Sequence, residues 1–457
     1  MTHAISMNPA TGAELQRYPF DSEAQLEHTL ADNFAAFEQW RYVALGERAA
    51  VIARMAHVLR EMSEPLAQMI TREMGKPITQ ARAEVEKCAG LCQWYAEHGP
   101  AMLAAEATQV PGQKARIEYR PLGPVLAVMP WNFPLWQVLR GAIPVILAGN
   151  GYLLKHAPNV MGSATLLREA FDQAGLPHGL FGVLNVEPAG VSRAIADPRV
   201  AAVTVTGSVG AGSAIAAQAG AALKKCVLEL GGCDPFIVLA DADMDEAVNA
   251  ALLGRFQNTG QVCAAAKRLI VESSILPAFT ERFVAATRAL KVGDPQLDDT
   301  YIGPMARFDL RDELDGQVQA SIEQGAQLLL GGHKLAGDGN YYAPTVLANV
   351  QPGMTAFDQE LFGPVASIVE ARDANHALAL ANDSDFGLSA TVWTGDVEMI
   401  EYFTERLETG AIFINGYGAS DARVGFGGIK KSGYGRELSH FGLREFCNAQ
   451  TVWLDRR

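Results

Sequence analysis

Short apolar runs that alternate with longer amphipathic stretches dominate the chain after Pro124. The apolar runs are 125–129, 152–154, 201–205, 226–230 and 236–239, and the stretches between them are 134–148, 161–174, 211–222 and 243–253. The runs predict buried strands and the stretches predict helices. Strands that alternate with helices of this length indicate βαβ units and a mainly parallel sheet. In such sheets, ligands bind at the carboxyl ends of the strands.

Further elements are predicted on both sides of this region. Residues 45–95 have the apolar spacing of helices, and a second α/β unit follows Cys263. Segment 113–121 alternates like a solvent-exposed strand, and the tail 450–453 predicts a strand that needs a partner, either 113–121 or another subunit. Within the second unit, strands are expected at 268–272, 390–393 and 411–414, and helices at 275–290 and 397–409. Without repeats or a low-complexity linker, we expect interleaved domains.

Composition and charge narrow the class of protein. The 457 residues suffice for two or three domains, and 49% hydrophobic with 19% charged residues predicts a compact globular protein. The net charge of −14 disfavours nucleic-acid or anionic-membrane partners. Apolar runs of membrane-spanning length are interrupted by charges or breakers, and residues 1–8 lack a basic-then-apolar signal. These features predict a cytoplasmic protein.

The six cysteines do not predict a disulfide framework, because they are scattered over a long chain that looks cytosolic. Cys88 and Cys92 are spaced to share one helix face. Val85 and Tyr95 continue that face as an apolar stripe, which favours core cysteines over metal ligands. We therefore predict no metal site.

A carboxylate and a thiol, 34 residues apart, are the first candidates for chemistry. Cys263 follows the polar, flexible segment 258–261, which predicts an accessible thiol and thus a nucleophile; the alternative is a buried core cysteine. Glu229 ends an apolar strand, where desolvation would raise its pKa towards the range of a general base. Alternatively, Glu229 caps a helix or pairs with Lys224 or Lys225.

Asn132 lies in the segment 130–134, Pro-Trp-Asn-Phe-Pro, which closes the first strand of the predicted sheet. Two prolines and two aromatic residues stiffen the backbone there. An amide donor fixed at a strand end is suited to a developing oxyanion. The alternative is a tight turn in which Asn132 forms a local hydrogen bond.

Two glycine-rich segments and one lysine are weaker candidates for a binding site than the residues above. Segment 206–212, Thr-Gly-Ser-Val-Gly-Ala-Gly, follows a buried strand and opens a helix, where a phosphate can approach the helix N-terminus. It departs from the G-x-G-x-x-G pattern. Lys155, which ends the neighbouring strand, either contacts a ribose or phosphate or is a solvated strand end. Segment 426–437 is too rich in glycine for regular structure, and it is either a functional loop or a connection.

Together, these motifs resemble those of the aldehyde dehydrogenase family along nearly the whole chain. In the order of the family they are 130–134, 206–208 with Gly212, 229–232, 260–263, 360–364 and the loop 427–437. The resemblance implies an α/β aldehyde dehydrogenase fold with a Rossmann-like cofactor domain, an α/β catalytic domain and a small β oligomerisation segment. It places the NAD(P)-binding domain at 1–103 and 122–231, the catalytic domain at 232–432, and the oligomerisation segments at 104–121 and 433–457.

The resemblance also implies roles for single residues. Cys263 attacks the aldehyde carbonyl, Asn132 and the Cys263 backbone N–H hold the oxyanion, and Glu229 activates the water that hydrolyses the thioester. These are the nucleophile, the oxyanion donor and the base that acyl transfer needs. Two residues match the family's positions that hold the nicotinamide ribose and ring: Glu360 and Phe362. Four residues match the positions on the adenosine and phosphate side of the cofactor: Lys155, Gly207, Ser208 and Trp131.

The cofactor is expected to be NAD or NADP. Many members of the family carry an acid that binds the adenosine ribose, but this chain has Pro158 at that place, in the segment 155–158, Lys-His-Ala-Pro. Without that carboxylate a 2′-phosphate is not repelled, and Lys155 can attract it. We therefore expect NAD use with NADP tolerated, or the reverse.

Within the family, the chain most resembles bacterial succinate-semialdehyde dehydrogenases, as in segments 69–83, 94–102 and 437–447. Arg140 matches an arginine that holds the substrate carboxylate in these enzymes, and Ser420 matches a second contact. The alternative for Arg140 is a surface helix arginine. Gln257 stands where some relatives have another arginine, which predicts a broader range of aldehydes.

Other functions remain open from the sequence. They are oxidation of other semialdehydes or aliphatic aldehydes, a cysteine esterase or hydrolase that needs no nucleotide, a CoA-acylating reaction, and a non-catalytic protein on the same scaffold. Glu229 favours hydrolysis over CoA transfer, because CoA-acylating enzymes usually dispense with the base. We expect a homodimer or a homotetramer with a small-molecule aldehyde as substrate.

Overall fold

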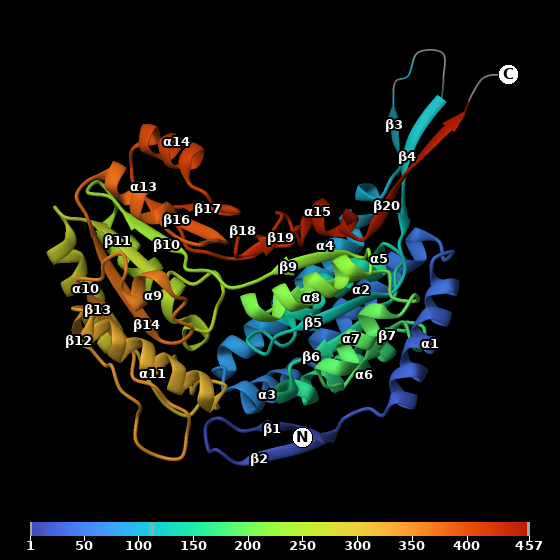
Figure 1. Ribbon diagram of the computed structural model, residues 1–457, viewed down its shortest axis with the longest axis horizontal. Helices are drawn as coiled ribbons and strands as arrows, with labels where there is room; N and C mark the ends of the chain where they lie inside the picture. Colours follow the sequence, from blue (N-terminus) through green and yellow to red (C-terminus); the bar gives the residue numbers. More distant parts are fainter. Residues whose placement is uncertain (1, 109, 111–113, 455–457) are drawn as a thin grey trace.

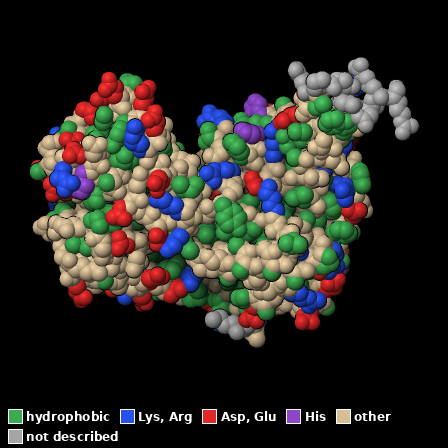
Figure 2. Space-filling model, turned by 45° about the horizontal axis from the view of Figure 1, so that its top comes forward, with side chains coloured by type: hydrophobic (Ala, Val, Ile, Leu, Met, Phe, Trp, Pro, Cys, Tyr) green, Lys and Arg blue, Asp and Glu red, His purple; other side chains and the backbone are tan. Residues whose placement is uncertain are grey.

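The computed structural model describes residues 2–108, 110 and 114–454 and has an α/β architecture. Two helix-covered sheets form two lobes, and a small third sheet projects from the lobe that contains the N-terminal half of the chain (Figure 1). Figure 2 shows a notch in the surface between the lobes. The alternating pattern predicted the layered α/β units, and the structure adds a cleft between them.

The first lobe is built on a doubly wound sheet. Its described strands are β5 (Val125–Met129), β6 (Tyr152–His156), β7 (Phe181–Val183), β8 (Ala202–Thr206), β9 (Lys225–Glu229) and β19 (Gly433–Tyr434). They lie in the order β19-β9-β8-β5-β6-β7, and all are parallel except β19, which is antiparallel to β9. Because β6 and β8 flank β5 on opposite sides, the chain reverses direction across the sheet there. Such a switch point is where doubly wound sheets bind ligands.

Helices cover both faces of this sheet (Figure 1). They are α1 (Glu23–Trp40), α2 (Leu45–Glu61), α3 (Ser63–Met74), α4 (Ile78–Met102), α5 (Trp136–Leu147), α6 (Met161–Gln173), α7 (Pro188–Ala196), α8 (Val209–Ala221), α15 (Ser439–Glu445) and the 3₁₀ turn η1 (Pro158–Val160). The helix α1 begins at a capping box formed by Ser22 and Gln25, which satisfies two of its free N–H groups. A hairpin of β1 (His3–Met7) and β2 (Glu14–Pro19) precedes it.

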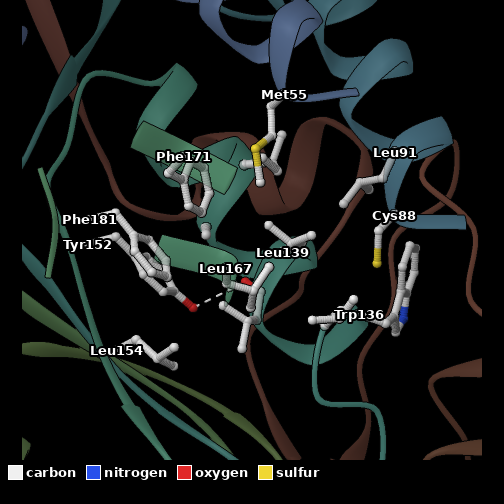
Figure 3. Close-up of a cluster of buried hydrophobic side chains, with 14 of the residues drawn as sticks. Met55, Cys88, Leu91, Trp136, Leu139, Tyr152, Leu154, Leu167, Phe171 and Phe181 are labelled. Carbon is white, nitrogen blue, oxygen red and sulfur yellow. Dashed lines mark hydrogen bonds between the residues drawn. The ribbon is translucent and has the colours of Figure 1, made fainter. Parts of the chain in front are cut away.

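The core of this lobe surrounds α5, all of whose residues are buried. Figure 3 shows the aromatic part of this core, where Tyr152 stacks on Phe181 with ring centroids 5.8 Å apart. The Tyr152 hydroxyl donates to the carbonyl of Val138 at 3.3 Å, drawn there as a dashed line. Cys88 and Cys92 are fully buried, so the prediction of core cysteines is confirmed.

The second lobe is built on a sheet of strands β10 (Pro235–Val238), β11 (Arg268–Glu272), β12 (Gln327–Leu330), β13 (Thr345–Ala348), β14 (Val365–Ala371), β16 (Ser389–Trp393) and β17 (Ala411–Ile414). Their order is β12-β13-β14-β11-β10-β16-β17, parallel except for β12. Its helices are α9 (Met244–Phe256), η2 (Gln257–Gly260), α10 (Leu276–Arg288), α11 (Phe308–Glu323), α12 (Thr355–Asp358), α13 (Ala374–Asn382) and α14 (Val397–Arg406). The sequence predicted β10, β11, β16, β17 and their helices, but it did not predict β12 to β14.

The projecting sheet contains β3 (Glu106–Thr108), β4 (Lys114–Pro121) and β20 (Cys447–Leu454), in the antiparallel order β20-β4-β3. The tail strand therefore pairs with the predicted strand 113–121 of its own chain; residue 113 itself lies outside the described residues. The prediction that segment 426–437 lacks regular structure was wrong in part, because its glycines permit two short strands. These are β19 and β18 (Ile429–Lys430), and β18 pairs with β15 (Phe386–Gly387).

The predicted domain boundaries stay a prediction, and β19, from the tail, is part of the sheet of the first lobe. Among the helices that the structure describes, each is too short or too polar to cross a membrane.

Candidate active site

The segment 258–261, which precedes Cys263, is buried, and this corrects the expectation of a flexible segment. Asn258, Thr259 and Gln261 are each at most 1% exposed. Their polar groups are satisfied inside the protein: the Gln261 side chain accepts from the Ala306 N–H, and Thr259 exchanges hydrogen bonds with the backbone of Gly303. Cys263 is partly exposed at the end of this segment. A polar composition here indicates a rigid, hydrogen-bonded support rather than a mobile loop.

The backbone before Cys263 is strained. Asn258 and Thr259 have φ of 53° and 56°, and Gly260 has φ of 72°. Left-handed conformations of this kind cost non-glycine residues free energy and persist only where their surroundings hold them. A Cβ atom at Gly260 would lie 2.2 Å from the carbonyl oxygen of Gly363, so only glycine fits that position. This turn directs the chain sharply towards Cys263.

Asn132 is locked to the same segment. The turn after β5 places it at the carboxyl end of the sheet, where it is 4% exposed. Its Nδ2 donates to the Gln261 carbonyl at 3.1 Å, and its own carbonyl accepts from Asn258 Nδ2 at 2.7 Å. Asn132 is therefore fixed relative to Cys263 by hydrogen bonds in both directions, and the open alternative of a purely local turn is wrong.

Two cavities meet at Cys263. The larger has a volume of about 680 Å³ and the smaller about 200 Å³, and both are lined by Cys263 and Gln137. The larger cavity gathers the predicted residues Trp131, Asn132, Gly207, Ser208, Glu360 and Phe362. The smaller one gathers Lys87, Trp136, Arg140, Gln257 and Ser420. Two ligands can thus reach one thiol from different cavities.

The larger cavity has the features of a dinucleotide site. It lies at the switch point between β5 and β8, and its wall includes Gly207 and Ser208 at the N-terminus of α8. The Ser208 hydroxyl caps this helix by accepting from the Ala211 N–H at 3.3 Å. Space is open beside Gly207, whereas a Cβ at Gly212 would lie 2.5 Å from the Leu230 side chain. A helix N-terminus with this clearance suits a pyrophosphate group.

Glu360 and Phe362 form the opposite wall. The Glu360 carboxylate accepts from the Gly232 N–H at 3.1 Å and pairs with Lys267 at 2.8 Å. The Phe362 ring meets Trp131 edge-on, with centroids 5.8 Å apart. That Glu360 and Phe362 hold the nicotinamide ribose and ring stays a prediction. Lys155, the last residue but one of β6, is outside the lining of this cavity, so its predicted contact stays a prediction.

The electrostatic surroundings hold Cys263 mainly as a thiol. Burial raises the pKa of Cys263, while the nearby positive charges of Arg140 and Lys267 oppose that rise. The two positive charges therefore stabilise the thiolate form of Cys263 relative to the thiol. Lys267 also donates to the Cys263 carbonyl oxygen, so it contacts both this residue and Glu360.

Glu229 ends β9 in a buried position, 2% exposed. Burial, and then the charge of Glu437, raise its pKa well above the ordinary range, against the opposing charges of Arg140 and Arg436. The predicted direction of this shift is therefore confirmed. Its alternative partners are engaged elsewhere, Lys225 with Glu445 and Lys224 with the Asp197 carbonyl.

The Glu229 side chain is directed towards the glycine-rich loop rather than towards the cavities. Its Oε1 lies 2.6 Å from where a Cβ of Gly427 would be, so Gly427 is what makes room for it. Glu229 lines neither of the two cavities that contain Cys263. In this arrangement the Glu229 carboxyl group is directed away from the Cys263 thiol.

Arg140 is deeply buried, 1% exposed, so the alternative of a surface arginine is wrong. It forms an ion pair with Glu437 and donates to the Thr206 hydroxyl at 3.3 Å. Ser420, which lines the same small cavity, accepts from Lys87 at 3.1 Å and from the Trp136 indole at 3.0 Å. The cavity next to the thiol is thus lined by positive and hydrogen-bonding groups.

Comparison with known families matches residues 2–452 to the aldehyde dehydrogenase family. The chain belongs to the aldehyde dehydrogenase family.

Named relatives of this family are similar over their full lengths. The chain is 66% identical over 455 residues to an Escherichia coli protein named succinate semialdehyde dehydrogenase, NAD(P)+, covering 100% of this chain and 98% of that one. It is 45% identical to an NADP(+) succinate-semialdehyde dehydrogenase of Mycolicibacterium paratuberculosis, over 98% and 96% of the two chains. The crystal structure of succinic semialdehyde dehydrogenase from Streptococcus pyogenes in complex with NADP+ superposes with a TM-score of 0.97 at 34% identity, covering 99% of this chain and 100% of that chain. The aldehyde dehydrogenase fold is therefore confirmed.

Several residues that support this aldehyde dehydrogenase site were not predicted. Glu84, on α4, accepts from the backbone N–H groups of Leu135 and Trp136 at 2.9 and 3.0 Å and forms a buried ion pair with Lys76. The Lys76 ammonium lies 3.7 Å from the centroid of the Phe133 ring. This pair therefore holds the turn that carries Asn132. A charged pair within a helical, largely apolar pattern was the signal that could have indicated it.

His156, on β6, contacts the same turn, residues 130–134. Its ring nitrogens lie 3.3 Å and 3.0 Å from the carbonyl oxygens of Met129 and Pro134, on both sides of Asn132. Burial lowers its pKa to about 4, so the imidazole is neutral at physiological pH. In the sequence, His156 is one polar residue at a strand end and does not reveal this partnership.

Proposed function

We infer that this aldehyde dehydrogenase oxidises succinate semialdehyde to succinate with NAD or NADP as the cofactor. The observation that carries this inference is the position of Cys263 in the wall of both cavities, one suited to a dinucleotide and one to a small anionic substrate. The named relatives support the same substrate and cofactors, since they are called NAD(P)+ and NADP(+) succinate-semialdehyde dehydrogenases.

The first step is attack of the Cys263 thiolate on the aldehyde carbon in the smaller cavity. A carbon–sulfur bond forms, and the carbonyl oxygen becomes the oxyanion of a thiohemiacetal. Asn132 Nδ2, fixed at the Gln261 carbonyl, and the Cys263 backbone N–H are the donors that hold this oxyanion. Because Asn132 is positioned before the reaction, little reorganisation is needed when the charge develops.

Oxidation then converts the thiohemiacetal into a thioester on Cys263. A bound nicotinamide cofactor supplies the hydride acceptor for this step. Trp131, Gly207, Ser208, Glu360 and Phe362 are proposed to hold that cofactor, with Lys155 near its adenosine side. Asn132 keeps its donor at the oxygen as the carbonyl of the thioester forms.

Glu229 is proposed to act last, as the base that takes a proton from the water that attacks the thioester. The water oxygen bonds to the carbonyl carbon, the carbon–sulfur bond breaks, and succinate and the Cys263 thiol are released. Burial holds this carboxyl group mainly in its neutral form, so Glu229 has to lose its own proton before it can act as the base. Its side chain has to turn from Gly427 towards Cys263 to do so.

The carboxylate of the substrate is proposed to bind at the far end of the smaller cavity, with Arg140 and Ser420 among its contacts. Assembly into a homodimer or homotetramer through the projecting sheet is also proposed, as is a cytoplasmic location.

An aldehyde panel tests this function. Reduced nicotinamide should appear, by its absorbance, with succinate semialdehyde and either NAD or NADP, and kcat/KM should be lower for neutral aldehydes such as butanal. Cys263→Ala should abolish the signal. Hydrolysis of an activated ester without formation of reduced nicotinamide from any aldehyde would instead favour the cysteine esterase.

A further inference from the structure

The smaller cavity contains one positive charge that the proposed mechanism does not use. Its wall has three charged side chains: Glu84, Lys87 and Arg140. Glu84 is occupied by Lys76 and by two backbone N–H groups, and Arg140 is paired with Glu437. Lys87 is different, because its hydrogen bond goes to a neutral hydroxyl.

Lys87, on α4, reaches the cavity beside Trp136 and Ser420. Its Nζ lies 4.0 Å from the centroid of the Trp136 ring and donates to Ser420 Oγ at 3.1 Å. Figure 3 shows the neighbouring Cys88 side chain beside Trp136, directed into the apolar core. Consecutive residues of one helix thus serve two purposes: Cys88 packs in the core, and Lys87 faces the cavity.

The hydrogen bonds of Ser420 leave its proton available. A hydroxyl has two acceptor positions and one donor. Both acceptor positions are used, one by Lys87 and one by the Trp136 indole N–H at 3.0 Å. The Ser420 O–H is therefore oriented away from both donors. Lys87 and Ser420 together present an ammonium and a hydroxyl proton at one place, which is the donor set that a carboxylate needs.

The surroundings of Lys87 favour an anionic ligand. The Lys87 side chain is exposed at the mouth of the cavity. The protein packed around its ammonium group desolvates it in part and lowers its pKa to about 8, with a smaller opposing effect from Cys88 and a small contribution in the same direction from Arg140. The carboxylates of Glu84 and Asp421 act only weakly on it. A carboxylate bound beside the ammonium would supply the counter-charge that these neighbours do not.

We propose that Lys87 is a specificity-determining cation of this enzyme, which binds the distal carboxylate of the aldehyde together with the Ser420 hydroxyl and in addition to Arg140. The inference rests on the proposed function, because it needs a substrate with a carboxylate. Lys87 binds the end of the substrate remote from Cys263, so it selects among aldehydes and takes no part in bond making. The competing role is structural, in which Lys87 only covers the Trp136 ring.

Two substitutions distinguish the effect of the Lys87 charge from the effect of its packing on Trp136. Lys87→Met keeps an unbranched side chain over Trp136 but removes the charge, and Lys87→Arg keeps the charge. The matched control is Lys291→Met, at an exposed lysine of the second lobe that pairs with Asp299. For each protein, kcat/KM is measured for succinate semialdehyde and for butanal, which has a methyl group in place of the carboxylate, and the ratio of the two values is compared.

The ratio for Lys87→Met should fall by roughly ten- to a hundredfold, as expected for one charged hydrogen bond. Activity on butanal should change by less than about threefold. Lys87→Arg should retain most of the ratio, and Lys291→Met all of it. An unchanged ratio in Lys87→Met, with a wild-type enzyme that prefers succinate semialdehyde, would overturn the role of Lys87 alone. A wild-type enzyme without that preference would refute the proposed function instead.

A pH profile gives a second readout that packing would not affect. Because the Lys87 ammonium is charged below its pKa of about 8 and neutral above it, the wild-type ratio should decline as pH rises through 8. Dividing by the butanal value removes the ionisation of Cys263, which both substrates share. The titratable and charged groups facing Lys87 are Glu84, Cys88, Arg140 and Asp421. The decline should be absent in Lys87→Met, and a decline that persists there would assign it to one of those groups and overturn the inference.

Discussion

Glu229 carries a cost in stability that follows directly from its burial. Its carboxyl group is 2% exposed, and both of its oxygens lack a hydrogen-bond partner among the described residues. A carboxylate in such a place is stable mainly in its neutral form, which is why its pKa is raised. The chain thus keeps a group that opposes folding at neutral pH, and carboxyl groups with such a raised pKa are typical of functional sites.

This cost predicts a pH-dependent gain from Glu229→Gln. The raised folded-state pKa means that unfolding allows Glu229 to ionise once the pH exceeds its unfolded value of about 4.3. The free energy of unfolding of Glu229→Gln should therefore equal that of the wild type near pH 4 and exceed it increasingly as the pH rises. Urea unfolding at several pH values measures this, with the exposed Glu370→Gln as control. A difference independent of pH would mean that packing, not ionisation, distinguishes the variants.

The thiol of Cys263 gives a second prediction. Because burial raises its pKa, the rate of its alkylation by iodoacetamide should continue to increase above the usual thiol pKa of about 8.5. Arg140→Met should slow alkylation at pH 8 roughly tenfold for each unit by which the pKa rises further, because the main charge that favours the thiolate is lost. Peptide mass spectrometry distinguishes Cys263 from Cys226 and Cys447. Equal rates in both proteins would show that Arg140 does not influence the thiol.

Single residues show where sequence reasoning reaches its limit. Cys263, Asn132 and Glu229 could be proposed because each stands in a motif of specific order and spacing. Lys87 and Glu84 could not, because their partners Ser420 and Leu135 are 333 and 51 residues away in the chain. The burial of the segment 258–261 was also missed, since its polar groups are satisfied by distant backbone atoms. Long-range pairing of polar groups is not visible in a local pattern.

At the scale of elements, the packing of α8 against β9 explains one glycine of the phosphate-side motif. Gly212 faces the Leu230 side chain, which would lie 2.5 Å from an added Cβ, whereas Gly210, on the same helix, has open space. Leu230 also lines the larger cavity. Close contact between helix and strand, rather than backbone freedom, is therefore what Gly212 provides.

The two glycines form a matched pair for a test. Gly212→Ala should displace Leu230 into the cavity, raise KM for the cofactor several-fold and destabilise the protein by about 1–3 kcal/mol. Gly210→Ala should leave KM unchanged and stabilise the helix by about 0.5–1 kcal/mol. Steady-state kinetics and thermal unfolding give both quantities. If the two variants behave alike, helix propensity alone governs this turn.

Elements with strong apolar periodicity were predicted within a few residues, as for β5, β11 and β17. The strands β5 and β11 are buried along nearly their whole length, so their sequence is continuous in hydrophobicity. The strand β17 is half-buried at the edge of its sheet but is also apolar throughout. The strands β18 and β19 were missed because they have two residues each and depend on partners far along the chain. The helix α11 was missed as well, since its sequence is mostly polar and few of its residues are buried.

At the scale of the whole molecule, the projecting sheet predicts how copies of the chain associate. Among the strands that the structure describes, its outer strand β20 pairs on one side with β4 and is an edge strand on the other. Leu454, at its end, is 50% exposed. An exposed edge strand with apolar side chains is unfavourable in isolation and is expected to be covered by another subunit.

Leu454→Asp should therefore weaken the assembly by roughly tenfold or more in its dissociation constant, the effect of losing one buried leucine. Leu297→Asp is the matched control, because Leu297 is 51% exposed on the second lobe. Light scattering at a series of protein concentrations measures the change. An equal effect of both substitutions, or none of either, would place the contact elsewhere.

The wall that the two cavities share also has a consequence for inhibition. Cys263 and Gln137 belong to both linings, so the two cavities adjoin at these residues. A single molecule that occupies both cavities would have to pass Cys263 and Gln137, whereas two small molecules can occupy the cavities at the same time. A compact electrophile that reacts with the Cys263 thiol is therefore a better inhibitor design for this enzyme than a long molecule that mimics both substrates.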